Sequence, residues 1–371
     1  MAEYTLVATA AFGLEAVVAR ELKALGFTNV AIGNGRVTFS GLEKDIPRVN
    51  MWLRCADRVL MKMGEFHASD FEQLFQGVRT IPWGVYIPSS GAVNVTGRSQ
   101  RSVLTSVPAC QSIVKKAIIE SMKRRHRLER FPETGPVFAI DFSLHNDVAS
   151  IYMDSTGPGL HKRGYRTGAG EAALKETLAA GIVYLSRWKP GIALVDPFCG
   201  SGTIAIEAAL IGRNIAPGIR RTFASEKWAF IDACLWEDAR REARQRETRV
   251  ELNVRASDAD EDVIIKARRN ARHAGVLSAV TFDARDIRDL VLGPQPGIAI
   301  CNPPYGERSG DKRSAGELMK VMRKVFDNAP GWSFFVFTGL EDFEKYYGKR
   351  SDSNRKLYNG KIKCYLHQFR S

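Results

Sequence analysis

The segment Asp196-Pro-Phe-Cys-Gly-Ser-Gly-Thr203 lies between two apolar runs, residues 192–195 and residues 203–211. The first run is typical of a buried strand and the second of a helix, so the segment is predicted to be a glycine-rich strand-to-helix turn. Gly200 and Gly202 permit a tight backbone and the close approach of a ligand, and the helix behind them offers free N–H groups. No Lys-Ser or Lys-Thr pair follows the last glycine and the spacing is not G-x-G-x-x-G, which disfavours a P-loop and a dinucleotide site.

Acidic residues end the strand before this turn and the strands that follow. A carboxylate at the first position suits the cationic methionine part of S-adenosylmethionine (SAM) better than it suits a phosphate. The candidate cofactor contacts in the turn are Asp196, Phe198, Gly200, Gly202 and Thr203. Asp258 follows the next predicted strand and can accept hydrogen bonds from both ribose hydroxyls, although it or Asp260 can instead be only a helix cap. Asp286 follows the third strand and can accept a hydrogen bond from the adenine amino group, or it is a solvated loop acid.

The tetrapeptide Asn302-Pro-Pro-Tyr305 follows a further apolar run, residues 298–301. An exocyclic amino group on a nucleobase is a poor nucleophile because its lone pair is delocalised into the ring. The side-chain carbonyl of Asn302 and the backbone carbonyl of Pro303 can accept the amino hydrogens and stabilise the positive charge that develops on the nitrogen. The prolines hold these acceptors in place, and Tyr305 can stack on an extruded base. Together the two motifs predict methyl transfer from SAM to an exocyclic amino nitrogen, with Asn302 also close to the cofactor.

A cysteine adjoins each motif, so a thiolate route to pyrimidine C5 is an alternative. Neither Cys199 nor Cys301 has a His or Lys activator nearby in the sequence, which disfavours that route. The six cysteines contain no C-x-x-C pair and the six histidines have no metal-ligand spacing, so we expect free thiols and no metal site. No apolar run is long enough to span a bilayer and the N-terminus is not a signal peptide, which indicates a cytoplasmic protein.

The charge of the chain favours a polyanionic partner. Its 371 residues carry a net charge of +13 at pH 7, and residues 1–165 alone carry 20 basic and 15 acidic side chains. The excess is therefore spread over both halves, as expected if both contact one nucleic acid, although many basic proteins simply have solvated basic surfaces. The candidate RNA-binding residues are Lys115, Lys116, Lys123, Arg124, Arg125 and Arg127, with Lys162 and Arg163 in a basic linker.

The order of predicted elements indicates an α/β protein with a smaller α+β N-terminal part. From residue 172 onward, helices alternate with strands predicted at 192–195, 250–256, 279–283, 298–301 and 333–338. This order predicts a parallel sheet, closed by an antiparallel hairpin at Asn359-Gly360. The N-terminal part reads as a strand at 4–10, a helix at 14–25, a hairpin at Gly33-Asn34-Gly35 and helical periodicity over 46–63. Strands at 91–96, 137–144 and 148–154 and a helix at 107–122 follow, with the basic run 123–127 after the helix.

With these motifs, the C-terminal half resembles the Rossmann-like class I SAM methyltransferases, and the whole chain resembles the THUMP-domain RNA methyltransferases. The resemblance is to bacterial enzymes that methylate guanine N2 in 23S ribosomal RNA and often carry the label of adenine-N6-specific DNA methylases. It rests on residues 160–166, 174–178, 196–203 and 302–308. It implies a ferredoxin-like domain over residues 1–65, an RNA-binding THUMP domain over 66–165 and a methyltransferase domain over 166–371. It also implies a seven-stranded sheet with an antiparallel last strand and an insertion over residues 211–250.

The leading hypothesis is SAM-dependent methylation of guanine N2 in 23S ribosomal RNA. The same chemistry on transfer RNA and adenine-N6 methylation of DNA or RNA are the nearest alternatives, because Asn-Pro-Pro-Tyr serves both reactions. A non-catalytic RNA-binding ribosome-assembly factor with a degenerate fold is a third. The intact Asp196, Asp258 and Asn302 disfavour it.

Overall fold

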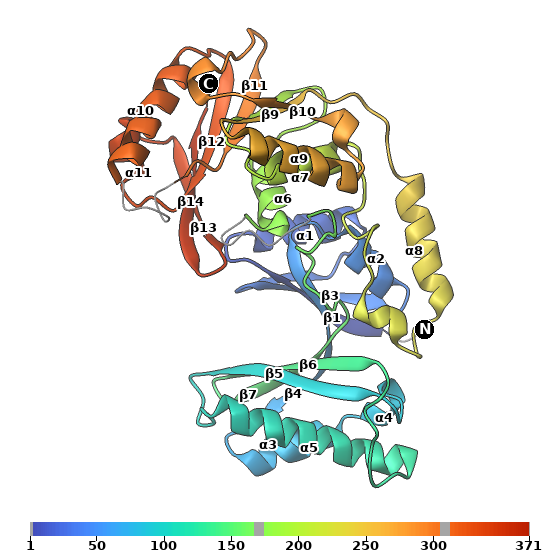
Figure 1. Ribbon diagram of the computed structural model, residues 1–371. Helices are drawn as coiled ribbons and strands as arrows, with labels where there is room; N and C mark the ends of the chain where they lie inside the picture. Colours follow the sequence, from blue (N-terminus) through green and yellow to red (C-terminus); the bar gives the residue numbers. More distant parts are fainter. Residues whose placement is uncertain (1–2, 167–173, 305–311, 371) are drawn as a thin grey trace.

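The computed structural model describes residues 3–166, 174–304 and 312–370 (Figure 1). Within these ranges the N-terminal half forms a seven-stranded sheet in the order β2-β3-β1-β4-β7-β6-β5. Its strands are β1 (Glu3–Ala10), β2 (Val30–Gly33), β3 (Arg36–Leu42), β4 (Ala56–His67), β5 (Ala92–Gln100), β6 (Val137–His145) and β7 (Val148–Asp154). Its helices are α1 (Glu15–Ala24), α2 (Asp45–Trp52), α3 (Phe71–Thr80), α4 (Trp83–Tyr86) and α5 (Val107–His126).

Strand β4 corrects the helical periodicity expected over residues 46–63. Helix α2 ends at Trp52, and β4 then pairs with β1 over its first half and with β7 over its second half. Val59 and Met61 are buried in the main core, whereas Leu60 is buried on the other side against Val7 and Tyr152. A strand that is buried on both faces carries a continuous apolar run, and periodicity alone does not distinguish such a run from a buried helix. Because β4 crosses residue 65, one continuous sheet runs through the two expected N-terminal domains.

The C-terminal half contains a second seven-stranded sheet in the described ranges, in the order β10-β9-β8-β11-β12-β14-β13. Its strands are β8 (Ala193–Asp196), β9 (Val254–Asp258), β10 (Thr281–Ala284), β11 (Gly297–Cys301), β12 (Trp332–Thr338), β13 (Ser353–Asn359) and β14 (Ile362–Phe369). Its helices are α6 (Glu176–Leu185), α7 (Thr203–Gly212), α8 (Ala233–Gln245), α9 (Glu261–Ala274), α10 (Lys312–Asp327) and α11 (Phe343–Tyr347). Short 3-10 helices lie at Ala224–Lys227, Leu277–Ala279 and Ile287–Asp289.

This second sheet has the predicted methyltransferase topology. The five strands β8 to β12 are parallel, and β14 is inserted antiparallel between β12 and β13, which confirms the expected antiparallel last strand. The strand order reverses at β8, because β9 and β10 lie on one side of it and β11 on the other. In open α/β sheets, ligands bind beyond the carboxyl ends of the strands at such a reversal. The ends of β8 and β11 are therefore where a ligand is expected.

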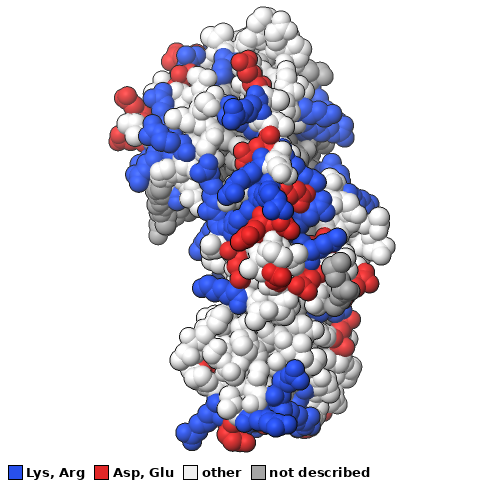
Figure 2. Space-filling view, turned by 90° about the vertical axis from the view of Figure 1, so that its right-hand side faces the viewer, with Lys and Arg blue, Asp and Glu red and all other residues white. Residues whose placement is uncertain are grey.

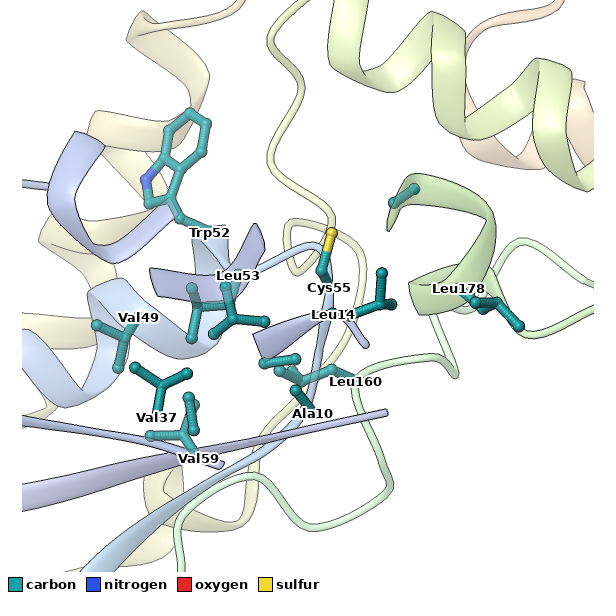
Figure 3. Close-up of a cluster of buried hydrophobic side chains, with 14 of the residues drawn as sticks. Ala10, Leu14, Val37, Val49, Trp52, Leu53, Cys55, Val59, Leu160 and Leu178 are labelled. Carbon is teal, nitrogen blue, oxygen red and sulfur yellow. The ribbon is translucent and has the colours of Figure 1, made fainter. Parts of the chain in front are cut away.

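The two halves share a hydrophobic core. Figure 1 shows the C-terminal half stacked on the N-terminal strands, with α3 and α5 at the far end of the molecule. In Figure 3, Leu14 and Cys55 lie between the N-terminal strands and helix α6, which carries Leu178. All three side chains are almost completely buried. Burial of a leucine side chain contributes about 2 kcal/mol, so this contact holds the two halves together.

The segment between α7 and α8 attaches the C-terminal half to the distal part of the first sheet. The Trp228 ring stacks on Phe138 of β6 with ring centroids 6.0 Å apart, and Phe230 meets Tyr86 of α4 edge to face at 5.2 Å. Such aromatic pairs stabilise contacts beyond their buried area. This part of the expected insertion therefore connects the two halves of the molecule.

None of the helices within the described ranges has the length and apolar character required to cross a membrane.

Candidate active site

The predicted glycine turn connects β8 to α7, and its two glycines have different roles. Both adopt left-handed backbone conformations, with φ of +51° at Gly200 and +83° at Gly202, a region that disfavours residues with a side chain. A Cβ atom at Gly202 would lie 3.1 Å from Ala267 and 3.2 Å from Phe282, so this glycine lets the turn pack on α9 and β10. Apart from Gly200 itself and its two chain neighbours, no described residue has an atom within 4 Å of the corresponding point at Gly200, which leaves room for a ligand.

Asp196, at the end of β8, is a buried carboxylate with an unused oxygen. The side chain is fully buried, and Oδ1 accepts a hydrogen bond from the Phe198 N–H at 3.3 Å. Oδ2 has no hydrogen-bond partner among the described residues. Burial raises the pKa of Asp196 well above its usual range, and the negative charge of Asp258 adds to the rise. A buried, unpaired carboxylate is costly unless a cation joins it, so Asp196 fits the cationic ligand that the sequence predicted.

Asp258 at the end of β9 ties this strand to the glycine turn. Its Oδ2 accepts the Gly200 N–H at 3.0 Å and its Oδ1 accepts the Asp260 N–H at 3.2 Å. A carboxylate can accept about four hydrogen bonds, so both oxygens can accept further donors such as ribose hydroxyls. Asp260 caps α9, because its side chain accepts from the N–H groups of Asp262 and Val263. The capping role therefore belongs to Asp260.

The remaining candidate cofactor contacts surround this turn. Thr203 is buried at the first position of α7, and its hydroxyl accepts a hydrogen bond from Arg166 Nη2 at 2.7 Å. Phe198 is half-buried and packs against the core formed by β11, β12 and α10. Asp286 is half-buried and bonds to the backbone N–H and the guanidinium of Arg288, at 2.8 Å and 2.9 Å. Asp286 is thus already engaged by its own loop, and its contact with adenine stays a prediction.

Asn302 places a second side-chain oxygen without a hydrogen-bond partner among the described residues at the same edge of the sheet. Strands β8 and β11 are paired neighbours, with Val195 opposite Ala299, so both chains leave the sheet side by side. The Asn302 Oδ1 atom is buried and has no partner among the described residues. Eleven buried side-chain nitrogen and oxygen atoms in the described ranges lack a partner, and the two oxygens among them are Asp196 Oδ2 and Asn302 Oδ1. Unpaired acceptors on adjacent strand ends indicate a site built to receive hydrogen-bond donors and positive charge.

The structure describes only part of the remaining reaction loop. Pro303 is buried next to Asn302, whereas Tyr305 lies outside the described residues.

Cys301 is fully buried in β11, and burial raises its pKa well above the usual thiol range. Burial likewise raises the pKa of Cys199. Because both thiols stay protonated at neutral pH, the thiolate route to pyrimidine C5 gains no support. In the part of the chain that the structure describes, no group of His, Cys, Asp or Glu side chains could hold a metal ion.

The basic run expected after the helix is instead the last turn of α5, with Arg127 as the left-handed residue that ends it. Lys115 pairs with Glu133 at 2.8 Å, and Lys123 pairs with Glu120 at 3.0 Å. Lys116 lies over the Phe75 ring at 5.7 Å. By contrast, Arg124, Arg125 and Arg127 are exposed and have no ion pair with any described residue. The unpaired arginines are therefore the stronger candidates for RNA contacts.

Arg163 does not fit the RNA contact expected of it. Its side chain is only 3% exposed, and its Nη2 lies 3.3 Å from Glu207 Oε2. It also donates to the backbone carbonyls of Leu160 and Arg54, which joins the linker to the N-terminal half. Glu207 was not predicted as its partner. A single carboxylate in the otherwise apolar helix Thr203–Gly212 could have indicated that a buried cation lies opposite it.

Arg166 is a second residue that the sequence analysis missed. Its Nη2 donates to the Leu174 carbonyl at 3.0 Å as well as to Thr203, and its Nε lies 3.4 Å from Glu176. The linker is thus attached directly to the first residue of the helix behind the glycine turn. Only its place in the basic linker could have drawn attention to it.

Three family models match consecutive parts of the chain. A model described as "RMKL-like, methyltransferase domain" matches residues 163–368. A model of the "RlmL ferredoxin-like domain" matches residues 5–60, and a model of the THUMP domain matches residues 68–154. The order and extent of the three matches follow the architecture described above.

Individual relatives agree with these matches. YpsC of Bacillus subtilis (strain 168), which is named as an RNA methyltransferase, is 44% identical over 372 residues, covering 100% of this chain and 96% of YpsC. The ribosomal RNA large subunit methyltransferase K/L of Psychromonas ingrahamii (strain DSM 17664 / CCUG 51855 / 37) is 38% identical, covering 96% of this chain and 49% of the relative. The chain thus spans about half the length of this K/L relative. The crystal structure of SMU.472, named as a methyltransferase and complexed with SAH, superimposes with a TM-score of 0.94 at 42% identity, covering 100% of this chain and 99% of that one.

Proposed function

Because the chain belongs to the family of RMKL-like methyltransferases, we propose that it transfers a methyl group from SAM to the exocyclic N2 of a guanine in 23S ribosomal RNA. One observation carries this proposal. The unpaired, buried oxygens Asp196 Oδ2 and Asn302 Oδ1 leave the sheet on neighbouring strands, beside a glycine turn that is open at Gly200. This arrangement provides an acceptor for the cofactor and an acceptor for the nucleophile at one place.

The residues of the turn fit SAM as the cofactor. SAM supplies a methyl group activated by its sulfonium charge, and the relative SMU.472 is complexed with SAH. In this chain Asp196 would face the cationic methionine part, Gly200 and Gly202 would line its path, and Asp258 would accept the ribose hydroxyls. Phe198, Thr203 and Asp286 complete the candidate set, with Asp286 closest to the adenine end.

Asn302 and Pro303 would act on the base to be methylated. The Asn302 side-chain carbonyl and the Pro303 backbone carbonyl accept the two hydrogens of the amino group. Their partial negative charges stabilise the positive charge that develops on the nitrogen as its lone pair attacks. Pro303 and the Asn302 Oδ1 atom are buried, which would keep these acceptors fixed before the base arrives.

The choice of RNA rests on the attached domain and on the names of relatives. The THUMP match covers residues 68–154, whose helix α5 ends in unpaired, exposed arginines. YpsC is named for RNA and the K/L relative for large-subunit ribosomal RNA. We therefore assign RNA binding to residues 66–165 and methyl transfer to residues 166–371, with residues 1–65 as a structural domain. An enzyme with this substrate would act in the cytoplasm.

Methylation assays with defined nucleic acids test the proposal. The protein is incubated with tritiated SAM and unmodified transcripts of 23S ribosomal RNA, with transfer RNA transcripts, or with duplex DNA. Digestion to nucleosides then separates N2-methylguanosine from N6-methyladenosine. Label in N2-methylguanosine of the 23S transcript supports the proposal, whereas label only in transfer RNA or only in N6-methyladenine contradicts it. Titration calorimetry with SAM tests the non-catalytic alternative, which requires that no binding heat is observed.

A further inference from the structure

A surface cleft of about 530 Å³ lies between the linker that precedes the methyltransferase domain and the segment that joins α7 to α8. We call it the linker cleft. Its polar lining consists of Lys162 from the linker, Arg220, Arg221 and Thr222 from the joining segment, and Arg240 from α8. The described lining contains four cationic side chains and no acidic side chain. A concave surface of one charge sign attracts ions of the opposite sign, so this cleft is suited to an anion.

Arg221 contributes a fixed positive charge to the wall of the linker cleft. Its Nη1 donates to the carbonyl oxygens of Gly159 at 2.7 Å and Lys162 at 3.1 Å, and its Nη2 donates to that of Pro158. No carboxylate among the described residues pairs with it, and its buried Nε has no hydrogen-bond partner. Burial and the nearby charge of Arg163 lower the pKa of Arg221 to about 10, so it remains cationic at neutral pH. Hydrogen bonds to three backbone carbonyl groups thus hold the guanidinium in place without neutralising its positive charge.

Lys162 and Arg220 are free cations at the mouth of the cleft. Both residues are exposed, and neither side chain has an ion pair or hydrogen bond with any described residue. Arg240 differs, because Glu226 lies 2.6 Å from its Nη2 and balances its charge. Three of the four cations in the described lining are therefore uncompensated, and two of these, Lys162 and Arg220, are exposed.

The cleft lies on the path between the THUMP domain and the glycine turn. Lys162 precedes Arg166 by four residues, which limits the distance between their Cα atoms to about 14 Å. Arg166 in turn contacts Thr203 at the start of α7. Figure 2 shows Lys and Arg gathered at mid-height of the molecule, with Asp and Glu among them, and again at its lower end, with a largely white stretch above the lower group. A nucleic acid that reaches from α5 to the site would pass this mid-height region.

We propose that the linker cleft binds a backbone phosphate of the substrate RNA, with Lys162 and Arg220 closing on the phosphate and Arg221 supplying fixed charge. The inference rests on the proposed function, since it takes RNA as the substrate. A backbone phosphate fits better than a free nucleotide, because the described lining of the cleft contains no aromatic side chain on which a base could stack. Binding there would hold the RNA between the THUMP domain and the glycine turn.

The test compares two double charge reversals in the full-length protein. Lys162→Glu with Arg220→Glu alters the cleft, and Lys320→Glu with Lys324→Glu on α10 is the control with the same change in net charge. Both control lysines are exposed, and α10 lies on the opposite side of the molecule from α8 in Figure 1. Binding of a 23S transcript is measured over a range of salt concentrations, and SAM binding is measured by calorimetry. A third variant, Lys162→Arg with Arg220→Lys, keeps both charges.

We expect the cleft variant to bind the transcript about tenfold more weakly near 0.1 M salt. The slope of log K against the logarithm of the salt concentration should become shallower by about 2. The control and the charge-conserving variant should match the wild type in RNA binding, and all variants should bind SAM equally. If the wild type binds and methylates RNA but the cleft variant equals the control, the cleft proposal alone fails. If adenosine monophosphate stabilises the wild type against heat, and the cleft variant loses only this effect, the cleft is a nucleotide site and the proposal is overturned. If the wild type binds no RNA, the proposed function itself fails.

Discussion

Two groups of buried polar oxygens, one on helix α7 and one at the ends of β8 and β11, differ in whether they are paired. On the helix, Glu207 accepts hydrogen bonds from Arg163 and from the Tyr165 hydroxyl, the latter at 3.1 Å. At the carboxyl ends of β8 and β11, Asp196 Oδ2 and Asn302 Oδ1 are buried without a partner among the described residues. The first group joins the linker to the C-terminal domain, and the second lies at the reversal of strand order where ligands bind.

This contrast separates structural from ligand-facing residues more reliably than charge does. A buried ionic group is stable only when a partner compensates for the loss of hydration. Glu207 has its partners within the chain, so its role is complete without a ligand. Asp196 and Asn302 each have a buried oxygen without such a partner among the described residues, so a ligand would supply it. Arg163 and Asp196 are both buried ionisable residues. The contrast predicts that removal of the Arg163 side chain lowers stability, whereas a change at Asp196 lowers SAM binding.

The largest expected effect is on stability, from Arg163→Ala. Removing one partner of a buried ion pair leaves the other unpaired and typically costs about 3–5 kcal/mol, so the free energy of unfolding should fall by this amount. Arg241 on α8 is the control, because its pair with Asp238 is exposed and Arg241→Ala should cost at most about 1 kcal/mol. Urea unfolding of both variants measures the difference. Equal, small losses would show that the Glu207 group does not hold the domains together.

Asn302→Ala should act on catalysis and leave the fold intact. Removal of one preorganised acceptor typically lowers kcat by about 10²- to 10³-fold. The affinity for SAM should change little, because in the proposed reaction the Asn302 carbonyl would face the base to be methylated. Single-turnover methylation and SAM calorimetry separate the two quantities. A matched loss of SAM affinity and unfolding free energy would instead place Asn302 among the structural residues.

Asp196 predicts a pH dependence of SAM binding. Because burial raises the pKa of Asp196, part of the free protein carries a protonated carboxyl group at pH values below that pKa. A cationic ligand favours the ionised form, so binding releases a proton in that range. The affinity should then rise by up to about tenfold per pH unit as the pH increases, and level off above the pKa. Asp196→Asn should bind SAM more weakly and lose this slope, which calorimetry at several pH values can measure. A slope that survives in the variant would assign the proton to another group.

Local sequence patterns were sufficient for the parts of the fold that depend on neighbouring residues. The glycine turn and the closing hairpin at Asn359-Gly360 were predicted in place, because each is set by backbone geometry within a few residues. The strands that lead to Asp196 and Asp258 were also predicted, but β9 begins at Val254, four residues later than expected. Strand β4 was missed because its two-sided burial depends on β1 and β7, and its apolar run has no strand periodicity.

The site was predictable where a residue acts through its position on the sheet, and less so where it acts through a distant partner. Arg163 was misassigned because Glu207, which pairs with it, lies 44 residues away and no local pattern connects them. The same limit applies to α5. Lys115 and Arg124 look alike in the sequence, yet only Lys115 has an ion-pair partner among the described residues.

The smallest expected effect extends the contrast to this helix. Arg124→Glu with Arg125→Glu removes two exposed, unpaired cations from the last turn of α5, and should weaken binding of a 23S transcript a few-fold and lower its salt slope by about 2. Lys115→Glu with Lys123→Glu changes the net charge equally, but both lysines already pair with carboxylates of this domain. Their reversal should therefore reduce the salt slope less. If both double variants shift the slope by the same amount, pairing within the chain does not decide which cations contact RNA, and net charge alone controls binding at this end of the molecule.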